Sequence, residues 1–225
     1  MIRSTVRHLP LVDRAGLVLK LCENKRVLHL GATDAPETEA AIRHHRFLHF
    51  QLATVAAYLV GMDNNQDAIN LLSAKYGVRN IRYGDIEKSS EYPKEEFDIV
   101  IAGEILEHLS NPGRALDALN EILSPGTTVV VTVPNAYSFK GFCRAFAGHE
   151  WIHPDHTLHH SPRTLDALLS RHGFSIDSTF CVINGGTGLL ARSTNQFLKL
   201  APQLAEGIGV VCRPVKAVSH AELQR

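Results

Sequence analysis

The chain has 225 residues, which suits one domain with a sizeable core and is too few for two large ones. Hydrophobic residues make up 44% and charged residues 20%, a globular balance that argues against long disordered segments. Lysine plus arginine and aspartate plus glutamate each number 23, so the formal net charge is zero and indicates neither a nucleic-acid nor an anionic-membrane partner.

The cysteines and the N-terminal residues indicate the cellular compartment. The four cysteines lie far apart without a C-x-x-C pair: Cys22, Cys143, Cys181 and Cys212. This spacing fits neither a zinc knuckle nor a disulfide framework and favours a reducing compartment. Polar residues between Pro10 and Lys20 interrupt any signal-peptide core, and no stretch approaches the roughly 18 apolar residues of a membrane span. We therefore expect a cytoplasmic protein without a membrane partner.

Short β-rich runs alternate with amphipathic stretches along the first half of the chain. Five runs are predicted strands: Arg26–Leu30, Tyr58–Met62, Asn80–Tyr83, Phe97–Ala102 and Thr127–Val133. Three stretches between them are predicted helices: Phe47–Ala57, Asn65–Tyr76 and Arg114–Leu123. Strands that alternate with helices in this way imply right-handed crossovers and a parallel sheet.

The pattern lapses over residues 134–160, which are rich in aromatic residues and histidine. We interpret this segment as a cover that excludes water from an acceptor pocket. The alternative is that its aromatic side chains fill a satellite core or a dimer contact, which leaves a homodimer open.

The alternation returns at Ser161 and Pro162, a predicted N-cap and first helical residue that open the helix Arg163–Arg171. A sixth strand is predicted at Phe174–Val182. Three glycines then predict a turn, and Leu189–Arg192 is a candidate antiparallel partner: the glycines are Gly185, Gly186 and Gly188. The rest is expected to be a helix at about 194–206 within a C-terminal segment, 193–225, that ends in a weakly specified tail. We expect one domain over 1–225, with its core at about 24–192.

Three features stand at predicted strand ends, where parallel sheets gather ligands. Gly31 follows the first strand, and a backbone without a Cβ lets a ligand approach closely. Asp63 ends the second strand, where a carboxylate can accept both hydroxyls of a ribose. Asp85 follows the third strand and could accept from an adenine amino group, while Ile86 packs on the ring. Each alone has an ordinary reading as a turn or a helix cap, but their joint order predicts a nucleotide-like cofactor.

The turn after the first strand bears on which cofactor this is. A dinucleotide fold needs G-x-G-x-x-G to hold a pyrophosphate at a helix N-terminus, whereas this turn is GATDAP. S-adenosylmethionine carries no phosphate and demands less of the loop, so NAD is disfavoured.

Four segments resemble the successive motifs of class I S-adenosylmethionine-dependent methyltransferases: RVLHLGATDA, YLVGMDNNQDAI, IRYGDIE and FDIVIAGEILEHLSNPGRALDALNEILSPG. The resemblance implies an α/β, Rossmann-like, doubly wound and mostly parallel seven-stranded sheet with an antiparallel last hairpin. It also implies cofactor contacts along the strand ends, at Gly31, Ala32, Asp63, Asn64, Asp85, Ile86 and Glu104. The chain departs from the family by keeping only the first glycine of G-x-G-x-G, and its stretch from Gly31 to Asp63 is longer than usual. A catalytically inactive relative is therefore one alternative.

The segment after the fourth strand carries the groups for acceptor chemistry. If this segment opens a helix, Glu104, Glu107 and His108 lie at i, i+3 and i+4 and share one face. Two carboxylates and an imidazole could bind a hard divalent cation, for which Mg²⁺ or Mn²⁺ is favoured over structural zinc.

The E-x-x-E-H string and the later Asp155-His156 are similar to two methyltransferase groups, the small-RNA 3′-terminal 2′-O-methyltransferases and the ubiquinone-pathway O-methyltransferases. This similarity implies Glu104, Glu107, His108 and His156 as metal ligands, with catalytic roles for His108 and His156. Two other readings stay open, in which His108 is a metal-free general base or a structural group.

The resulting hypothesis is an O-methyltransferase that acts on a hydroxyl of a small-molecule or glycan-type acceptor. An RNA 3′-terminal 2′-O-methyltransferase is the enzymatic alternative, but a nucleic-acid partner is disfavoured because phosphate-tracking surfaces need Lys and Arg. A non-catalytic cofactor-binding or scaffold protein is the third.

Overall fold

The apolar runs come together as one sheet in the computed structural model, which describes residue 6, residues 8–183 and residues 189–215. Five strands lie parallel in the order β6-β5-β2-β3-β4. Their bounds are β2 Arg26–Leu30, β3 Tyr58–Asp63, β4 Ile81–Tyr83, β5 Ile99–Gly103 and β6 Thr128–Pro134. Each lies within two residues of its predicted position, because aliphatic and β-branched residues fill buried strands. The predicted parallel core is confirmed.

The register of the parallel strands brings their carboxyl ends to one edge of the sheet. Leu30 of β2 lies opposite Met62 of β3 and Ala102 of β5. Asp63, the next residue of β3, lies opposite Tyr83 of β4. The strand order reverses between β2 and β5, which is where open α/β sheets bind their ligands.

The predicted antiparallel hairpin exists, but its second strand lies elsewhere than expected. β7 (Phe174–Ile183) pairs with β8 (Gly207–Pro214), and β8 also pairs with β6. Residues 189–192, expected to be the antiparallel partner, instead open the helix α8 (Leu189–Leu200). The glycine turn predicted at 185–188 falls outside the described residues.

β8 was mistaken for a tail because glycines weaken the strand signal in its sequence. A Cβ at Gly209 would lie 2.3 Å from two ring carbons of Phe180 on β7, so the packing between the strands demands glycine there. The helix expected at about 194–206 ends at Leu200, which leaves the chain free to return as a buried strand between β6 and β7.

An eighth strand extends the sheet beyond the seven that the family resemblance implied. β1 (Leu11–Asp13) pairs in parallel with β7 at the edge. The helix α1 (Arg14–Cys22) follows at once, and the Asp13 carboxylate caps it by accepting from the Gly16 N–H at 2.8 Å. The core therefore begins well before the predicted boundary at about residue 24.

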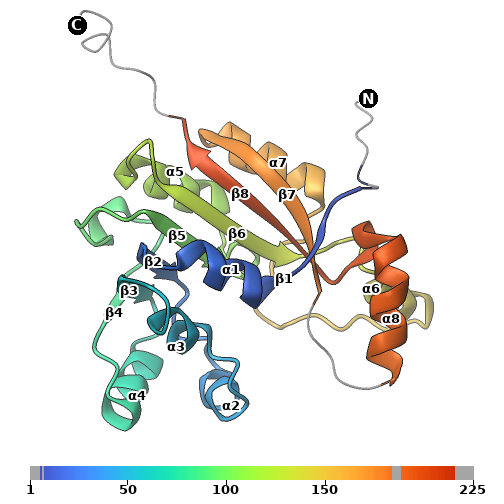
Figure 1. The fold of residues 1–225 in the computed structure, drawn as a ribbon, viewed down its shortest axis with the longest axis horizontal. Helices are drawn as coiled ribbons and strands as arrows, with labels where there is room; N and C mark the ends of the chain where they lie inside the picture. The colour runs from blue at the N-terminus through green and yellow to red at the C-terminus, as the bar shows by residue number, and fades with distance from the viewer. Residues whose placement is uncertain (1–5, 7, 184–188, 216–225) are drawn as a thin grey trace, which may run out of the picture.

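Helices cover both faces of the sheet, with α5 and α7 on one face and α1 and α3 on the other (Figure 1). The bounds of these helices and of α4 are α3 Leu48–Ala53, α4 Gln66–Tyr76, α5 Pro112–Ile122 and α7 Pro162–Arg171. Side chains of Asn65, Asn111 and Ser161 accept backbone N–H groups at the starts of α4, α5 and α7. The predicted helices are confirmed, although α3 is shorter than expected.

Besides α1, two short α-helices lie where no helix was predicted. α2 (Thr38–Arg43) occupies part of the long stretch between β2 and β3. α6 (Phe139–Phe146) lies in the aromatic segment after β6, near α8 (Figure 1).

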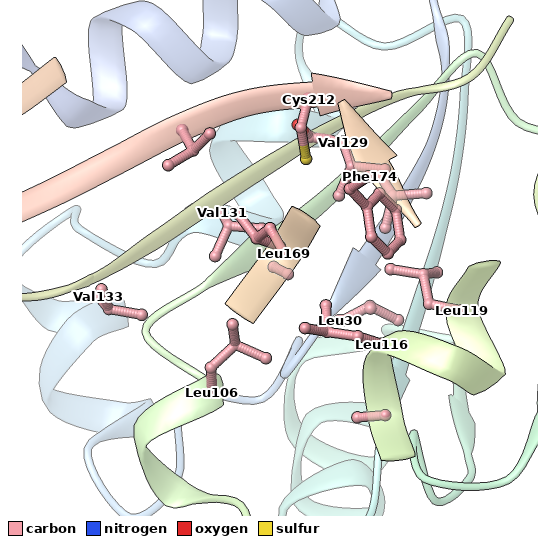
Figure 2. Packing of buried hydrophobic residues seen from close by; sticks show 14 of the residues in the cluster. Leu30, Leu106, Leu116, Leu119, Val129, Val131, Val133, Leu169, Phe174 and Cys212 are labelled. Atoms are coloured by element: carbon pink, nitrogen blue, oxygen red, sulfur yellow. The ribbon is translucent and has the colours of Figure 1, made fainter. Parts of the chain in front are cut away.

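The larger core lies between the sheet and helices α5 and α7. Figure 2 shows Leu116 of α5 and Leu169 of α7 packed with Val131 of β6, and all three are essentially inaccessible to solvent. This layer holds the carboxyl ends of β5 and β6 in place.

Among the helices of the described residues, none combines the length and the apolar character that crossing a bilayer requires.

Candidate active site

The turn after β2 is shaped by a glycine in the left-handed region. Gly31 has φ +68°, and its N–H donates to the Met62 carbonyl oxygen at 2.9 Å. A Cβ at Gly31 would lie 3.0 Å from Cδ1 of Ile105, which comes from the segment after β5. The turn therefore requires glycine and lies directly against the start of the Glu104–His108 segment.

Asp63 ties this turn to the end of β3. Asp63 is 9% exposed, and its Oδ2 accepts both the N–H and the hydroxyl of Thr33 at 2.9 Å. Its Oδ1 accepts the Asn65 N–H at 2.9 Å. Each oxygen has two lone pairs, so Oδ1 retains capacity for one more donor in this set of contacts. Thr33 went unnoticed in the sequence, where a threonine in a turn gives no functional signal.

The other predicted cofactor residues differ in what they can offer. Asp85 is half-buried, and its Oδ1 accepts the Glu87 N–H at 3.0 Å while Lys88 Nζ lies 3.4 Å from Oδ2. Ile86 packs in the larger core. The side chain of Ala32 is fully buried, so a ligand at the turn would meet its backbone, and Asn64 is exposed.

A cavity of about 450 Å³ lies beside the Asp63 loop, between α2 and the start of α4. Arg43 and Asn65 are among its lining residues, but neither Glu104 nor His108 is. The long stretch between β2 and β3 therefore helps to form a hollow beside the Asp63 loop that the acceptor-side groups do not line.

The prediction of a helix across Glu104–His108 is wrong. Glu104 has φ +53°, so the chain bends sharply as it leaves β5, and its N–H donates to the Thr132 carbonyl oxygen at 2.8 Å. Only a single 3₁₀ turn, Leu106–His108, follows. Because the α-helical period does not apply, the structure divides the four predicted metal ligands between two groups.

The first group is a pair of carboxylates beside an arginine. Arg14 Nη1, at the start of α1, lies 3.4 Å from Glu104 Oε1. Glu107 is fully buried, and neither of its carboxylate oxygens has a hydrogen-bond partner within the described residues. Burial raises the pKa of Glu107, and the Glu104 charge raises it further. Burial also raises the pKa of Glu104, while the Arg14 charge opposes that rise.

The second group is a cluster of three imidazoles, which we call the histidine cluster: His108, His153 and His156. Each residue offers one ring nitrogen, and these three atoms all lie within 4.8 Å of one another. Among the described residues, no carboxylate joins this group at that distance. The ring centroid of His108 lies 4.5 Å from that of His156 and 5.3 Å from that of His153. Burial lowers the pKa of His108 and of His156, and the neighbouring imidazole charges add to the shift.

His153 is the member that sequence reasoning missed. It has no role predicted from the sequence, although its spacing from His156 places both residues on one turn of chain, closed by the His156 N–H donating to the His153 carbonyl oxygen at 3.0 Å. The His-x-x-His spacing was the signal available.

Residues 134–160 lie beside the end of β5, as a cover would. The Thr157 N–H donates to the Glu107 carbonyl oxygen at 2.8 Å, and the Thr157 hydroxyl donates to the Leu109 carbonyl oxygen at 3.0 Å. Phe142, Phe146 and Trp151 are 65%, 85% and 73% exposed, so these side chains fill no satellite core. The cover and dimer-contact readings both stay predictions.

Comparison with known proteins places this arrangement in a family. A family model described as "Methyltransferase domain" matches residues 9–179. A Mycolicibacterium smegmatis protein named "Probable S-adenosylmethionine-dependent methyltransferase" is 26% identical over 135 residues, which are 60% of this chain and 50% of that protein. The ubiquinone biosynthesis O-methyltransferase of a Bradyrhizobium species is 33% identical over 100 residues, 44% of this chain and 39% of the relative. The chain thus spans half or less of the length of these relatives.

Solved structures show the same fold. A methyltransferase in complex with the Haloferax volcanii Trm112 activator superposes with a TM-score of 0.60 at 14% identity, covering 92% of this chain and 90% of that one. The N-methyltransferase NodS from Bradyrhizobium japonicum, in complex with S-adenosyl-L-homocysteine, superposes with a TM-score of 0.56 at 15% identity, covering 90% and 86%. At these identities the likeness concerns the fold alone.

Proposed function

The chain belongs to the class I S-adenosylmethionine-dependent methyltransferases, and from that membership we propose that it methylates a hydroxyl group of a small-molecule or glycan-type acceptor. S-adenosylmethionine supplies an electrophilic methyl group on a positively charged sulfur. The protein's part is to align the acceptor with that methyl group and to take up the hydroxyl proton.

The residues at the strand ends fit this cofactor. Gly31 gives a turn with no side chain of its own, and Asp63 has a carboxylate oxygen with a lone pair that a ribose hydroxyl could use. Asp85 stands at the end of β4, next to β3. We propose that Gly31, Asp63 and Asp85 hold the cofactor, with the backbone of Ala32 beside them.

One observation carries the proposal: the donor-side turn and the acceptor-side segment touch. Ile105, two residues past β5, packs against Gly31 of the turn after β2. This contact brings Glu107 and His108 to the neighbourhood of the cofactor turn, where a carboxylate or an imidazole nitrogen can accept the proton that a hydroxyl loses. The ubiquinone-pathway relatives, which are named as O-methyltransferases, favour oxygen as the acceptor atom.

The aromatic cover suits a small acceptor better than a nucleic acid. Its helix α6 carries exposed Phe side chains and only two cations, Lys140 and Arg144. Tracking a phosphate backbone needs many more cations than that.

The test is the release of S-adenosylhomocysteine in the presence of separate panels of phenols, sugars and amines, with an RNA oligonucleotide as a further arm. Turnover with hydroxyl compounds and a methyl ether as product is the expected result. Methylation of amines alone, or turnover only with the RNA 3′ end, would overturn the proposal in favour of another acceptor. Cofactor binding without turnover on any panel would support the non-catalytic reading.

A further inference from the structure

We infer that the histidine cluster, His108, His153 and His156, binds a divalent transition-metal cation of the zinc or cobalt type, with no carboxylate ligand. This site differs from the oxygen-rich magnesium or manganese site that the sequence suggested. It rests on side-chain geometry and not on the proposed methyl transfer, so the two can fail separately.

The three imidazoles already converge. A nitrogen atom from each lies within 4.8 Å of the others, whereas ligands of one tetrahedral Zn²⁺ at bond lengths of about 2.0–2.1 Å lie roughly 3.3 Å apart. Closing that difference requires the imidazole rings to turn when the ion binds. The rings lie mostly edge to face rather than stacked, with interplanar angles of 86° for His108 and His156 and 74° for His108 and His153.

The backbone around the cluster fixes the two segments that supply it. Both the N–H and the hydroxyl of Thr157, next to His156, donate to carbonyl oxygens flanking His108. The His156 N–H closes a turn onto the His153 carbonyl oxygen at 3.0 Å. These bonds hold His108 from one segment against the two histidines of the other, which lowers the ordering cost of binding an ion.

The carboxylate of Asp155 lies near His153, one of the three ligands. Asp155 Oδ2 lies 3.9 Å from Nδ1 of His153, whose Nδ1 also accepts the Asp155 N–H at 3.3 Å. If Nε2 of His153 binds a cation, the proton moves to Nδ1, which then gives up the Asp155 N–H and, after a small rotation, can donate to the Asp155 carboxylate, the usual arrangement behind metal-bound histidines.

The ligand set decides the class of ion. Three imidazole nitrogens suit Zn²⁺, Co²⁺ or Ni²⁺, while Mg²⁺ and Ca²⁺ require oxygen ligands. Glu104 and Glu107 belong to the separate carboxylate pair beside Arg14 and stand outside the cluster. A three-histidine set also leaves one tetrahedral position for water or an acceptor oxygen, as catalytic zinc sites do.

The experiment titrates CoCl₂ and ZnCl₂ into tag-free, chelator-treated protein, reading the visible absorption of Co²⁺ and the heat of Zn²⁺ binding. We expect one ion per chain and a tetrahedral Co²⁺ spectrum. His153→Ala and His156→Ala should weaken binding at least about 100-fold, since each removes one of three ligands. His149→Ala, an exposed histidine of the same segment, is the matched control and should bind as wild type does.

Glu107→Gln separates the two possible sites. It should keep Zn²⁺ affinity within about threefold if the imidazoles alone bind the ion. Thermal melting checks that each variant is folded, and His153→Gln, which keeps more of the side-chain volume, replaces His153→Ala if that variant unfolds. The inference is overturned if wild type shows no 1:1 binding, if the His153 variant binds like wild type, or if Glu107→Gln alone loses the ion.

Discussion

A buried histidine pair on β2 and α3 makes the loss of folding stability in acid the sharpest test of the fold. His29 on β2 and His49 on α3 are 5% and 1% exposed, and their Nδ1 atoms lie 3.2 Å apart. Nε2 of His49 lies 3.3 Å from Oδ1 of Asn80, whose Nδ2 donates to the Leu59 carbonyl oxygen. We infer that His49 Nε2–H donates to Asn80 and that its bare Nδ1 accepts from His29.

Protonating His49 would set two N–H groups against each other, and burial lowers its pKa to about 4. A histidine pKa below the unfolded value of about 6.5 gives stability that is full above pH 6.5 and is lost as pH falls towards 4. Between about pH 7.5 and pH 4.5 this one group should remove roughly 2 to 3 kcal/mol from the free energy of unfolding.

The perturbation is His49→Gln, which cannot titrate. At about pH 7.5 we expect the variant to be less stable by roughly 1 kcal/mol, because its hydrogen bonds are poorer. At about pH 4.5 the difference should have shifted by those 2 to 3 kcal/mol, which leaves the variant more stable than wild type by about 1 to 2 kcal/mol.

Urea denaturation of both proteins at both pH values measures the change, and carboxylate effects shared by the two proteins cancel in the comparison. His29, whose pKa burial also lowers, keeps its own pH dependence in the variant. Parallel pH profiles for the two proteins would refute the reasoning.

Further substitutions test the turn and the core. Gly31→Ala and Gly77→Ala both place an alanine at a φ near +70°, so each should cost about 1 to 2 kcal/mol in unfolding experiments. Only Gly31→Ala should also weaken S-adenosylhomocysteine binding, because only Gly31 meets another side chain within 4 Å; equal affinities for the two variants would contradict this. Leu169→Ala should cost about 2 to 5 kcal/mol because Leu169 is fully buried, and a loss no larger than that of the partly buried Leu168→Ala would contradict its core role.

The parallel core could be predicted because its strands are short aliphatic runs between capped helices. The failures have physical causes. β8 contains Gly207 and Gly209, which depress strand propensity, yet Gly209 is needed where the Phe180 ring crosses the sheet. β1 has only three residues, too few for a visible alternation. β1 becomes a strand by pairing with β7, which lies far away in the sequence, and β8 by pairing with both β6 and β7.

The candidate site was half predictable. Gly31 and Asp63 stand at their predicted strand ends, because strand termini follow from the hydrophobic pattern. Glu104 could not be placed, since its φ of +53° replaces the expected helix by a bend that depends on Thr132 of the next strand. The His-x-x-His spacing links His153 to His156 in the sequence, but the tertiary hydrogen bonds of Thr157 that bring both to His108 leave no trace in it.

The central claim is that the ends of β2 and β3 hold S-adenosylmethionine, and calorimetric titration of its product, S-adenosylhomocysteine, tests it most directly. We expect 1:1 binding to wild type and a loss of roughly 10- to 100-fold in Asp63→Asn, since an amide cannot replace a charged acceptor worth about 1.5 to 3 kcal/mol. Asp67→Asn, an exposed residue in the first turn of α4, should bind as wild type does. No binding to wild type at millimolar ligand, or equal affinity in Asp63→Asn, would contradict the account.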